Sequence, residues 1–510
     1  MLRASNFLNV GSSKKLFDLL KTKEFWLIFS ITFLAAFLRF YRLRELMVFL
    51  GDEGRDALLV KRLIVDHDPI LVGPTTSVGK IHLPPLYYYF MAPWLILSGL
   101  DPIGPAIGVA LLGTLTVPLL YFFSKNLLGK RAAFFTTVLY SVSHVAISNT
   151  RFSWNPNPMP LVSLFLIYCI YKIWQKQSFK AAVGVFFFLG LCLQLHYMVL
   201  ILTPFIVFFM SLAFWKARTN PAKLKNLFLA NLLGFLVLLV LLSPLLIFDL
   251  KHNLINFYGL KEFFVKGHHT NANILKIIKD IQGRSYQVIG NILGLPANLW
   301  RNAITWVIII AFFGSVYFAK KRKKQLLFLA CLLITTIVGL ALYEGDVYPH
   351  YIGFVFPLPF IIVGYGLSLL WQKRLGKIVS LVVLIGLSVI NIYKSPIFFK
   401  KGWNVDDVKS LARQIAQKCP KRGYNVVLVD ATKDYRAMNY RYFLEILGCP
   451  PLSTENYPEA EILYVISPDK IGDFEALNMW EIKSLGELEV LEEKKAEGEP
   501  WVYKLIKNSK

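Results

Sequence analysis

Apolar runs close to 20 residues long recur along the first 400 residues and are separated by short polar segments. A transmembrane helix needs about 20 consecutive apolar residues, so the pattern predicts a polytopic α-helical membrane protein with about 11 transmembrane helices. The expected spans are residues 25–43, 105–124, 131–149, 158–175, 181–198, 199–215, 227–248, 303–319, 325–342, 351–371 and 377–393.

The segment 84–99 is apolar and aromatic, but a proline pair opens it and Pro93 interrupts it. If it does not cross the membrane, every short basic loop falls on the same side as the lysine-rich N-terminus, which satisfies the positive-inside rule. We therefore predict that the first outer loop, residues 44–104, holds interfacial or re-entrant helices. The basic loop residues are Lys125, Lys130, Arg131, Lys172, Lys176, Lys180, Lys216, Arg218, Lys223, Lys225, Lys320, Lys321, Arg322, Lys323, Lys324, Lys373, Arg374 and Lys377.

Hydropathy falls after the transmembrane domain, which we assign to residues 1–401. Two short apolar runs, 426–429 and 462–466, predict buried strands, and the segments around them predict helices at 405–418 and 433–447. Residues 402–510 are thus expected to form a small C-terminal α/β domain. Because about 11 spans that start from a cytoplasmic N-terminus end outside, we expect this domain to be extracytoplasmic.

The composition, 55% hydrophobic and 15% aromatic, excludes a soluble globular protein. A net charge of +24 would suit nucleic acid, but the basic residues form short clusters between apolar runs, where orientation signals lie. We expect no nucleic-acid partner. Cys419 and Cys449 are the two cysteines in a polar region, and the sequence is compatible with either a disulfide or two free thiols.

An acidic motif, Gly-Asp-Glu-Gly-Arg-Asp at 51–56, lies just outside the first span. Ionised groups beside hydrocarbon lose hydration unless a partner or a water-filled cavity replaces it, so the motif is a candidate reaction centre. In a helix Asp52 and Glu53 would point about 100° apart, so one would do chemistry and the other would be paired. We expect Asp52 to be a general base, with Arg55 beside it. The alternative is an acidic helix start in which Arg55 pairs with the acids.

Further along the same loop, His82 precedes the proline pair and Tyr87 follows it. His82 is expected to face a phosphate as a cation or hydrogen-bond donor, and Tyr87 joins it as a substrate-binding candidate. The alternative is that the prolines turn the chain at the interface and Tyr87 is one of several belt aromatics.

Arg151, Trp154 and Asn155 follow a predicted span in the turn-rich sequence Arg-Phe-Ser-Trp-Asn-Pro-Asn. The guanidinium would offer a fork of donors to a phosphate or a sugar. The alternative is an arginine that snorkels to the interface beside a belt tryptophan.

Two His-Tyr pairs, His196-Tyr197 and His350-Tyr351, also lie at predicted outer span ends. They are substrate-binding candidates, with satisfied interfacial histidines as the alternative. No tight spacing of His, Cys and Asp indicates a metal site, and we expect neither metal nor cofactor. Under the predicted topology all of these motifs meet on the outer face, which indicates one extracytoplasmic site.

The order of these motifs resembles the dolichyl-phosphate-mannose protein mannosyltransferase and aminoarabinose transferase superfamily, glycosyltransferase family 39-like proteins. The resemblance rests on the acidic motif at 51–55, Asp-His-Asp-Pro at 66–69 and His-Leu-Pro-Pro-Leu-Tyr-Tyr at 82–88, and it recurs at 350–359. It covers about residues 20–400. Members are integral membrane glycosyltransferases of the GT-C fold.

The resemblance implies a hexosyl- or pentosyltransferase that moves a sugar from a polyprenyl-phosphate donor to an acceptor hydroxyl on a cell-envelope glycan, lipid or protein. Transfer would occur at the outer face of the plasma or inner membrane. By position Asp52 resembles the catalytic aspartate of the first loop, and His82 stands where some relatives have a lysine. The chemistry agrees, because displacement of a phosphate needs one base and cations, for which Asp52 and Arg151 are suited.

Two other classes of function remain open. A lipid or sugar transporter or flippase would move its substrate without glycosyl transfer, but the charged motifs lie at span ends and no pair of broken helices appears in two related halves. A structural assembly factor would use its outer domain to bind a partner. An assay with polyprenyl-phosphate sugars separates the three.

Overall fold

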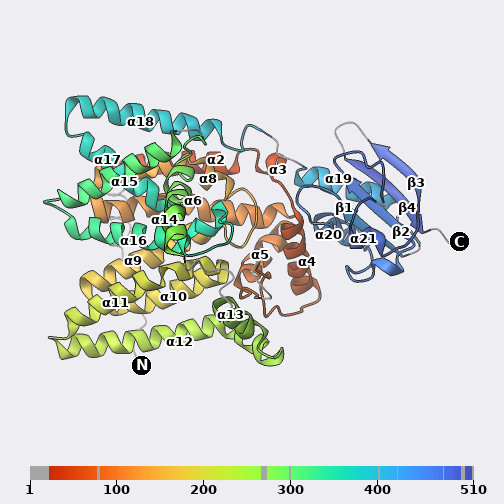
Figure 1. Ribbon diagram of the computed structural model, residues 1–510, viewed down its shortest axis with the longest axis horizontal. Coiled ribbons are helices and arrows are strands. Elements are labelled where there is room, and N and C mark those ends of the chain that lie inside the picture. Colours follow the sequence, from red (N-terminus) through yellow and green to blue (C-terminus); the bar gives the residue numbers. More distant parts are fainter. Residues whose placement is uncertain are drawn as a thin grey trace, which may run out of the picture.

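The structure is a computed structural model that describes residues 22–507 except 77–80, 266–272, 298–299, 400–402, 422, 475 and 496–499. Most of the lysines in the predicted cytoplasmic N-terminus and the proposed domain boundary at Gly402 lie outside these residues. A long bundle of helices forms one part of the molecule, and a small α/β domain lies at one end of it (Figure 1).

A helix or a helix pair lies at each of the eleven predicted spans. Five of the described helices are long and apolar enough to cross a membrane, and six are if the bent pair η3 and α17 forms one span. A multi-pass membrane protein is therefore supported, whereas the number of eleven crossings stays a prediction. The bundle contains α2 (Lys23–Phe40), α6 (Ile103–Leu128), α7 (Lys130–Ser141), α8 (His144–Ser148), α9 (Met159–Lys176), α10 (Phe179–Leu195), η1 (Tyr197–Leu202), α11 (Thr203–Ala217), α12 (Pro221–Lys251), α15 (Arg301–Tyr317), α16 (Lys323–Ala341), η3 (Pro349–Val355), α17 (Pro357–Leu370) and α18 (Arg374–Tyr393).

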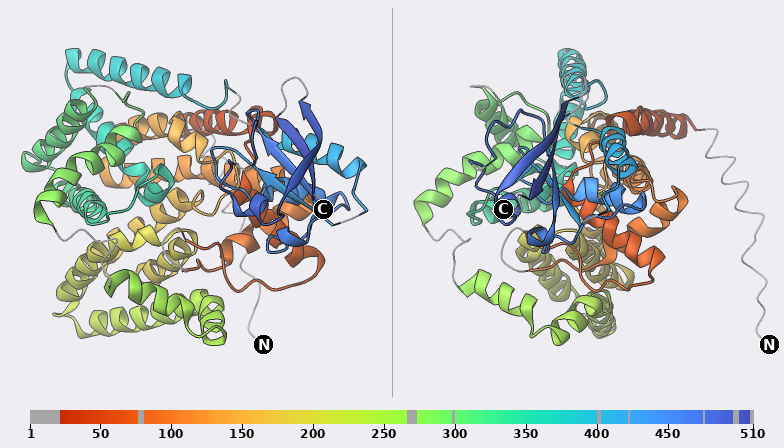
Figure 2. Two further views of the ribbon diagram at one scale, coloured as in Figure 1. Left: turned by 45° about the vertical axis from the view of Figure 1, so that its right-hand side comes forward. Right: turned by 90° about the vertical axis from the view of Figure 1, so that its right-hand side faces the viewer.

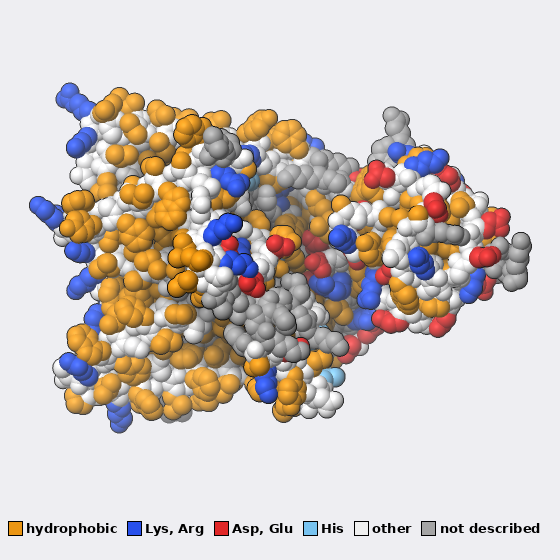
Figure 3. Space-filling model, in the orientation of Figure 1, with side chains coloured by type: hydrophobic (Ala, Val, Ile, Leu, Met, Phe, Trp, Pro, Cys, Tyr) orange, Lys and Arg blue, Asp and Glu red, His pale blue; other side chains and the backbone are white. Residues whose placement is uncertain are grey.

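Lysine and arginine side chains gather at the end of the bundle farthest from the α/β domain (Figure 3). Contacts between loops agree with this view. Glu24 pairs with Lys125 and Lys130, and the Arg322 guanidinium donates a hydrogen bond to the carbonyl of Leu127. Apolar side chains cover the bundle surface between the two ends, as expected for helices that face lipid. The fold therefore separates a basic end from the end that carries the α/β domain.

The first outer loop contains three helices, α3 (Leu43–Leu46), α4 (Gly51–Val65) and α5 (Leu86–Leu97). Helix α5 corresponds to the segment 84–99. Its 12 residues give a length of about 18 Å, less than the roughly 30 Å of bilayer hydrocarbon. The long connection between α12 and α15 contains α13 (Ile255–Val265), α14 (Ile274–Ser285) and the π-helical η2 (Tyr286–Asn291).

The C-terminal segment forms a four-stranded sheet with strand order β1-β2-β4-β3. β1 runs parallel to β2, and β4 is antiparallel to both of its neighbours. The sequence predicted β1 and β2, but it missed β3 and β4, because β3 is an exposed edge strand rich in glutamate and lysine. The elements of the C-terminal domain are α19 (Val405–Gln417), β1 (Tyr424–Leu428), α20 (Met438–Ile446), η4 (Tyr457–Glu459), β2 (Ile462–Ser467), α21 (Trp480–Lys483), β3 (Leu488–Lys495) and β4 (Trp501–Lys507).

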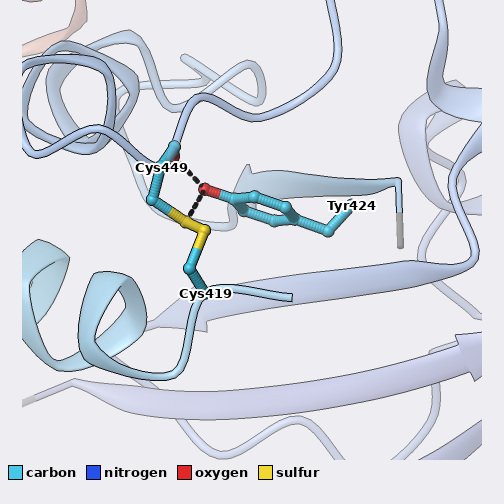
Figure 4. The surroundings of a disulfide bond; sticks show 3 residues. All are labelled: Cys419, Tyr424 and Cys449. Atoms are coloured by element: carbon cyan, nitrogen blue, oxygen red, sulfur yellow. Dashed lines mark hydrogen bonds between the residues drawn. A yellow bond between two sulfur atoms is a disulfide. The ribbon is translucent and has the colours of Figure 1, made fainter. Parts of the chain in front are cut away.

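A disulfide joins Cys419 to Cys449 and ties the end of α19 to the segment after α20 (Figure 4). The hydroxyl of Tyr424 donates a hydrogen bond to the carbonyl of Cys449. The sequence had left the pairing of these cysteines open, and the fold resolves it by bringing the ends of two helices together.

The C-terminal domain shares a hydrophobic core with the first outer loop. Phe49, which precedes α4, packs edge-on against Phe443 of α20 at 5.4 Å between ring centroids. Two views show the blue C-terminal helices beside the red-orange α4 (Figures 1 and 2). The boundary predicted near residue 402 therefore separates two chain segments, but not two independent cores.

Candidate active site at the first outer loop

Helix α4 separates the two adjacent acids as helical geometry predicts. Its first turn is closed by Glu53, whose Oε2 accepts a hydrogen bond from the Leu50 amide at 3.1 Å. Glu53 is only 4% exposed, whereas the side chain of Asp52 keeps 48% of its surface exposed. Asp52 is therefore the carboxylate of the pair that an external molecule can reach.

Arg55 joins the accessible acid to a buried one. Its Nη1 lies 2.7 Å from Asp52 Oδ1, and its Nη2 lies 2.8 Å from Asp56 Oδ1. The hydroxyl of Tyr88 also donates a hydrogen bond to Asp56 Oδ1, at 3.0 Å. Burial lowers the pKa of Arg55, but the attraction of Asp56 and Asp52 outweighs it and raises that pKa above its usual value. The charged guanidinium orients the Asp52 carboxylate.

Sequence reasoning did not include Asp56 and Tyr88 among the site residues. Asp56 is fully buried, and burial raises the pKa of its carboxyl. The available signal was its position four residues after Asp52 with Arg55 between them, a spacing that puts both acids on one side of a helix.

Burial raises the pKa of Glu53 from 4.5 to about 8. A raised carboxyl pKa means that the folded protein holds a proton that the unfolded chain has released between these two values. Stability is therefore fully present below pH 4.5 and falls as the pH rises toward 8. Glutamine carries no charge but can still accept the Leu50 hydrogen bond.

We expect Glu53→Gln to flatten the dependence of the apparent Tm on pH between pH 5 and 8. The wild type should lose thermal stability across this window, because the unfolded chain ionises Glu53 while the folded protein still holds its proton. Thermal unfolding in detergent at a series of pH values measures both curves. Parallel curves for the two proteins would show that Glu53 has the same pKa in the folded and the unfolded states.

A His-aromatic cluster forms where η1, η3 and the segment before α9 meet. Its members are Trp154, His196, Tyr348, His350 and Tyr351. The rings of Trp154 and His350 are 4.3 Å apart, and those of His196 and Tyr351 are 4.6 Å apart. Tyr348, which the sequence analysis missed, stacks on His350 with ring planes 6° from parallel. Three segments distant in the sequence thus meet here. Among the described residues, no three Asp, Glu, His or Cys side chains are grouped to hold a metal ion.

His82 and Tyr197 are linked to each other rather than to the cluster. The hydroxyl of Tyr197 donates to the carbonyl of His82 at 2.7 Å, and the His82 amide donates to Asn256 Oδ1 at 2.6 Å. Asp249 in turn accepts a hydrogen bond from the amide of Asn256 at 2.8 Å. Burial lowers the pKa of His82, so its ring is a neutral hydrogen-bonding group at neutral pH rather than a cation.

Tyr87 and Asn155 are buried, and they join the segment around Trp154 to α5 and to the end of α10, respectively. The hydroxyl of Tyr87 shares a hydrogen bond of 2.8 Å with Ser153, and Asn155 Nδ2 donates to the carbonyl of Leu195 at 2.6 Å. Glu53 and Ser153 also line one small cavity. Its other walls are Met47, Phe49, Ala57, Met91, Pro102 and Pro105. The acidic motif and the segment that leads to the His-aromatic cluster therefore adjoin.

Arg151 is 3% exposed and points at the end of α2. Its Nη1 donates to the carbonyls of Leu38 and Arg39, and its Nη2 donates to that of Arg42, at 2.9–3.2 Å. The Leu38 and Arg39 carbonyls lie in the last turn of α2, where carbonyls have no partner within the helix, so the guanidinium stabilises the helix terminus. This geometry corrects the expectation that Arg151 presents its donors to a phosphate. We retain it as a structural residue.

Comparison with known proteins bears on this fold and site. Residues 82–248 match the family described as dolichyl-phosphate-mannose-protein mannosyltransferase. ArnT from Cupriavidus metallidurans, bound to undecaprenyl phosphate, is similar over 95% of this chain and 98% of its own, with 15% identity and a TM-score of 0.57. The oligosaccharyltransferase AglB from Archaeoglobus fulgidus, in complex with an inhibitory peptide and a dolichol-phosphate, is similar over 87% and 70%, with 14% identity and a TM-score of 0.53. No curated protein gives a significant match.

The family match and the shared fold confirm the predicted resemblance to GT-C glycosyltransferases of the protein mannosyltransferase and aminoarabinose transferase superfamily.

Proposed function

We propose that this chain, with its GT-C fold and its match to the mannosyltransferase family, is an integral membrane glycosyltransferase that uses a polyprenyl-phosphate-linked sugar. Asp52 is its general base, and the acceptor is a hydroxyl on a cell-envelope glycan, lipid or protein. The observation that carries this proposal is the half-exposed Asp52 carboxylate, oriented by Arg55 at the start of α4. Asp52 lies on the part of the molecule that is remote from the basic loops.

The proposed reaction is a single displacement. The acceptor oxygen attacks the anomeric carbon while Asp52 takes the hydroxyl proton, and the bond from that carbon to the phosphate oxygen breaks with its electron pair leaving on the phosphate. The products are a glycoside and a polyprenyl phosphate. One base is sufficient, because phosphate is already a competent leaving group, and the configuration at the anomeric carbon inverts.

The donor side of the site is assigned to the His-aromatic cluster and to His82 with Tyr197. Aromatic faces such as Trp154 and Tyr348 suit the apolar face of a sugar ring, and neutral imidazoles offer hydrogen bonds to its hydroxyls or to the phosphate. Tyr348 is 52% exposed, so the cluster is accessible from one side. The lipid phosphates bound by ArnT and AglB support a lipid-linked donor.

We assign the basic end of the bundle to the cytoplasm and the C-terminal domain to the outer face. The positive-inside rule supports the first assignment. The Cys419–Cys449 disulfide supports the second, because such bonds persist in oxidising compartments and are rare in the cytosol. The protein would then reside in the plasma or inner membrane with its active site outside.

The function is tested by incubating the purified protein in liposomes with radiolabelled polyprenyl-phosphate sugars and candidate acceptors. We expect labelled product with a new glycosidic bond for the wild type and none for Asp52→Asn. Movement of label across the membrane without a new bond would instead identify a transporter. If the label is neither transferred to any of the acceptor classes named nor moved across the membrane, both functions are contradicted.

The assigned orientation of the C-terminal domain predicts which side of the membrane a thiol reagent must reach to label Cys419. After reduction, a membrane-impermeant maleimide should label Cys419, which is exposed, in intact spheroplasts. The matched control is Cys419→Ser/Cys449→Ser, which should stay unlabelled. Labelling that requires permeabilised membranes would place the C-terminal domain in the cytoplasm.

A further inference from the structure

The two glycines of the acidic motif lie directly beneath the C-terminal domain. A Cβ atom at Gly51 would lie 1.9 Å from Oδ2 of Asp434, and one at Gly54 would lie 2.5 Å from the backbone nitrogen and Cα of Asn439. Contacts this short are not tolerated between heavy atoms, so a side chain at Gly54 would collide with backbone, and one at Gly51 would displace the Asp434 carboxylate. Gly51 and Gly54 are three residues apart on α4 and therefore share the helix face that meets α20.

Hydrogen bonds hold the chain that leads into α4 against the same domain. Asn439 Nδ2 donates to the carbonyl of Phe49 at 3.0 Å, and the Val405 amide donates to the carbonyl of Met47 at 3.1 Å. Farther along α4, Lys61 pairs with Glu445 of α20 at 2.7 Å. Helix α4 is thus fixed at its entry, along its first turn and in its third turn.

The loop that carries Asp434 is held in an unusual conformation. Lys433 and Ala437 flank it with φ angles of +58° and +51°, in the left-handed region that residues with a side chain rarely adopt. Asp434 Oδ2 accepts a hydrogen bond from the Met438 amide at 3.0 Å, so the carboxylate is fixed while it touches Gly51. The loop follows β1 at its carboxyl end, the edge from which ligand-facing loops usually extend in parallel sheets. Such local strain persists only where its surroundings enforce it.

We propose that the C-terminal domain is a positioning element of the active site, with Asp434 and α20 setting the orientation of the first turn of α4 and hence of Asp52. This inference rests on the proposed function, because it concerns the base of that reaction. A domain that served only as a tether would need neither two glycines in contact with it nor a fixed carboxylate over the residue that precedes Asp52. Asp434 is a positioning residue in this account and does not touch the reacting atoms.

The inference is tested by introducing a steric clash between α4 and the C-terminal domain and then removing it. Gly51→Ala should lower kcat by about 10²-fold, the typical cost of a misplacement near 1 Å, and leave the donor KM within about twofold. Asp434→Gly in the same protein removes the side chain that the new methyl group meets. Asp434→Gly alone should lower kcat less than Gly51→Ala does, because it loses a positioning contact without adding a collision. The double variant should therefore regain the kcat of Asp434→Gly alone. Gly54→Ala meets backbone atoms instead, so Asp434→Gly should not rescue it.

The matched control is Gly283→Ala, since a Cβ atom at this outer glycine meets nothing within 4 Å. It should behave as the wild type. Formation of the Cys419–Cys449 disulfide confirms that each variant has folded its C-terminal domain. Wild-type kcat in Gly51→Ala, or a double variant as slow as Gly51→Ala, would overturn the inference.

Hydrogen exchange of the α4 amides gives a second readout that does not need transfer activity. Gly51→Ala should speed exchange in α4, and the double variant should restore the rate of Asp434→Gly. If the wild type makes no glycosidic bond, the proposed reaction fails, and the exchange data alone decide whether the C-terminal domain positions α4. Unchanged exchange in Gly51→Ala would overturn the inference even if transfer is observed.

Discussion

Asp52→Asn is expected to abolish sugar transfer while the protein stays folded and inserted in the membrane. Asparagine keeps the shape of the side chain and an oxygen that can accept the Arg55 hydrogen bond, but it cannot take the acceptor proton. Loss of one positioned general base typically lowers the rate by about 10²–10⁴-fold. Turnover of a radiolabelled polyprenyl-phosphate sugar measures the effect, with the apparent Tm as the test of folding.

The neighbouring acid provides the matched control. Glu53→Gln should retain near-normal turnover, because Glu53 is buried and its oxygen is used by the Leu50 amide. Near-normal turnover in Asp52→Asn together with an inactive Glu53→Gln would assign the base to Glu53. The two variants differ by one position in the chain, and each replaces an acid by its amide in the same turn of α4.

Arg151→Ala is expected to destabilise the protein strongly. It removes three hydrogen bonds from a buried guanidinium, two of them to the Leu38 and Arg39 carbonyls at the end of α2. A hydrogen bond that involves a charged group contributes about 1.5–3 kcal/mol, so we expect a loss on the order of 3 kcal/mol or more. Thermal unfolding and yield after extraction in detergent measure this loss.

Arg151→Lys separates the structural role from a role in donor binding. Lysine keeps the charge, but its single ammonium group cannot reach all the carbonyls that the two terminal nitrogens of the planar guanidinium bind. It should therefore restore only part of the stability. The fraction of each variant that remains folded should bind donor with a wild-type KM. A stable Arg151→Ala protein with a greatly raised donor KM would instead return Arg151 to the phosphate site.

The sequence pattern was sufficient for the bundle because burial in lipid leaves a strong local signal. A helix or helix pair lies at each predicted span, but α7 ends at Ser141 and α8 begins at His144, where the pattern predicted one helix over 131–149. The Ser143 side chain accepts a hydrogen bond from the Ala146 amide and starts the second helix. Such a break depends on one polar contact, which a hydropathy pattern does not resolve.

The candidate site residues stood out in the sequence where polar and aromatic residues are adjacent in the chain. The acidic motif, the Trp154 segment and the His-Tyr pairs were singled out in this way, and the structure brings Trp154, His196, His350 and Tyr351 together. The direction of each side chain was not predictable. Arg151 looked like a free donor, but its guanidinium turns toward the end of α2, where backbone carbonyls accept hydrogen bonds from both of its terminal nitrogens.

The sequence by itself determined the class of the protein and its apolar helices, and it singled out Asp52 as the candidate base, because hydropathy, helical periodicity and motif order act over short stretches of chain. Only the tertiary structure decided that Asp56 and Tyr88 complete the acidic motif, that Cys419 bonds to Cys449 and that Asp434 lies over Gly51. These contacts join residues up to several hundred positions apart. Their geometry depends on how whole elements pack, and no local pattern of residues records it.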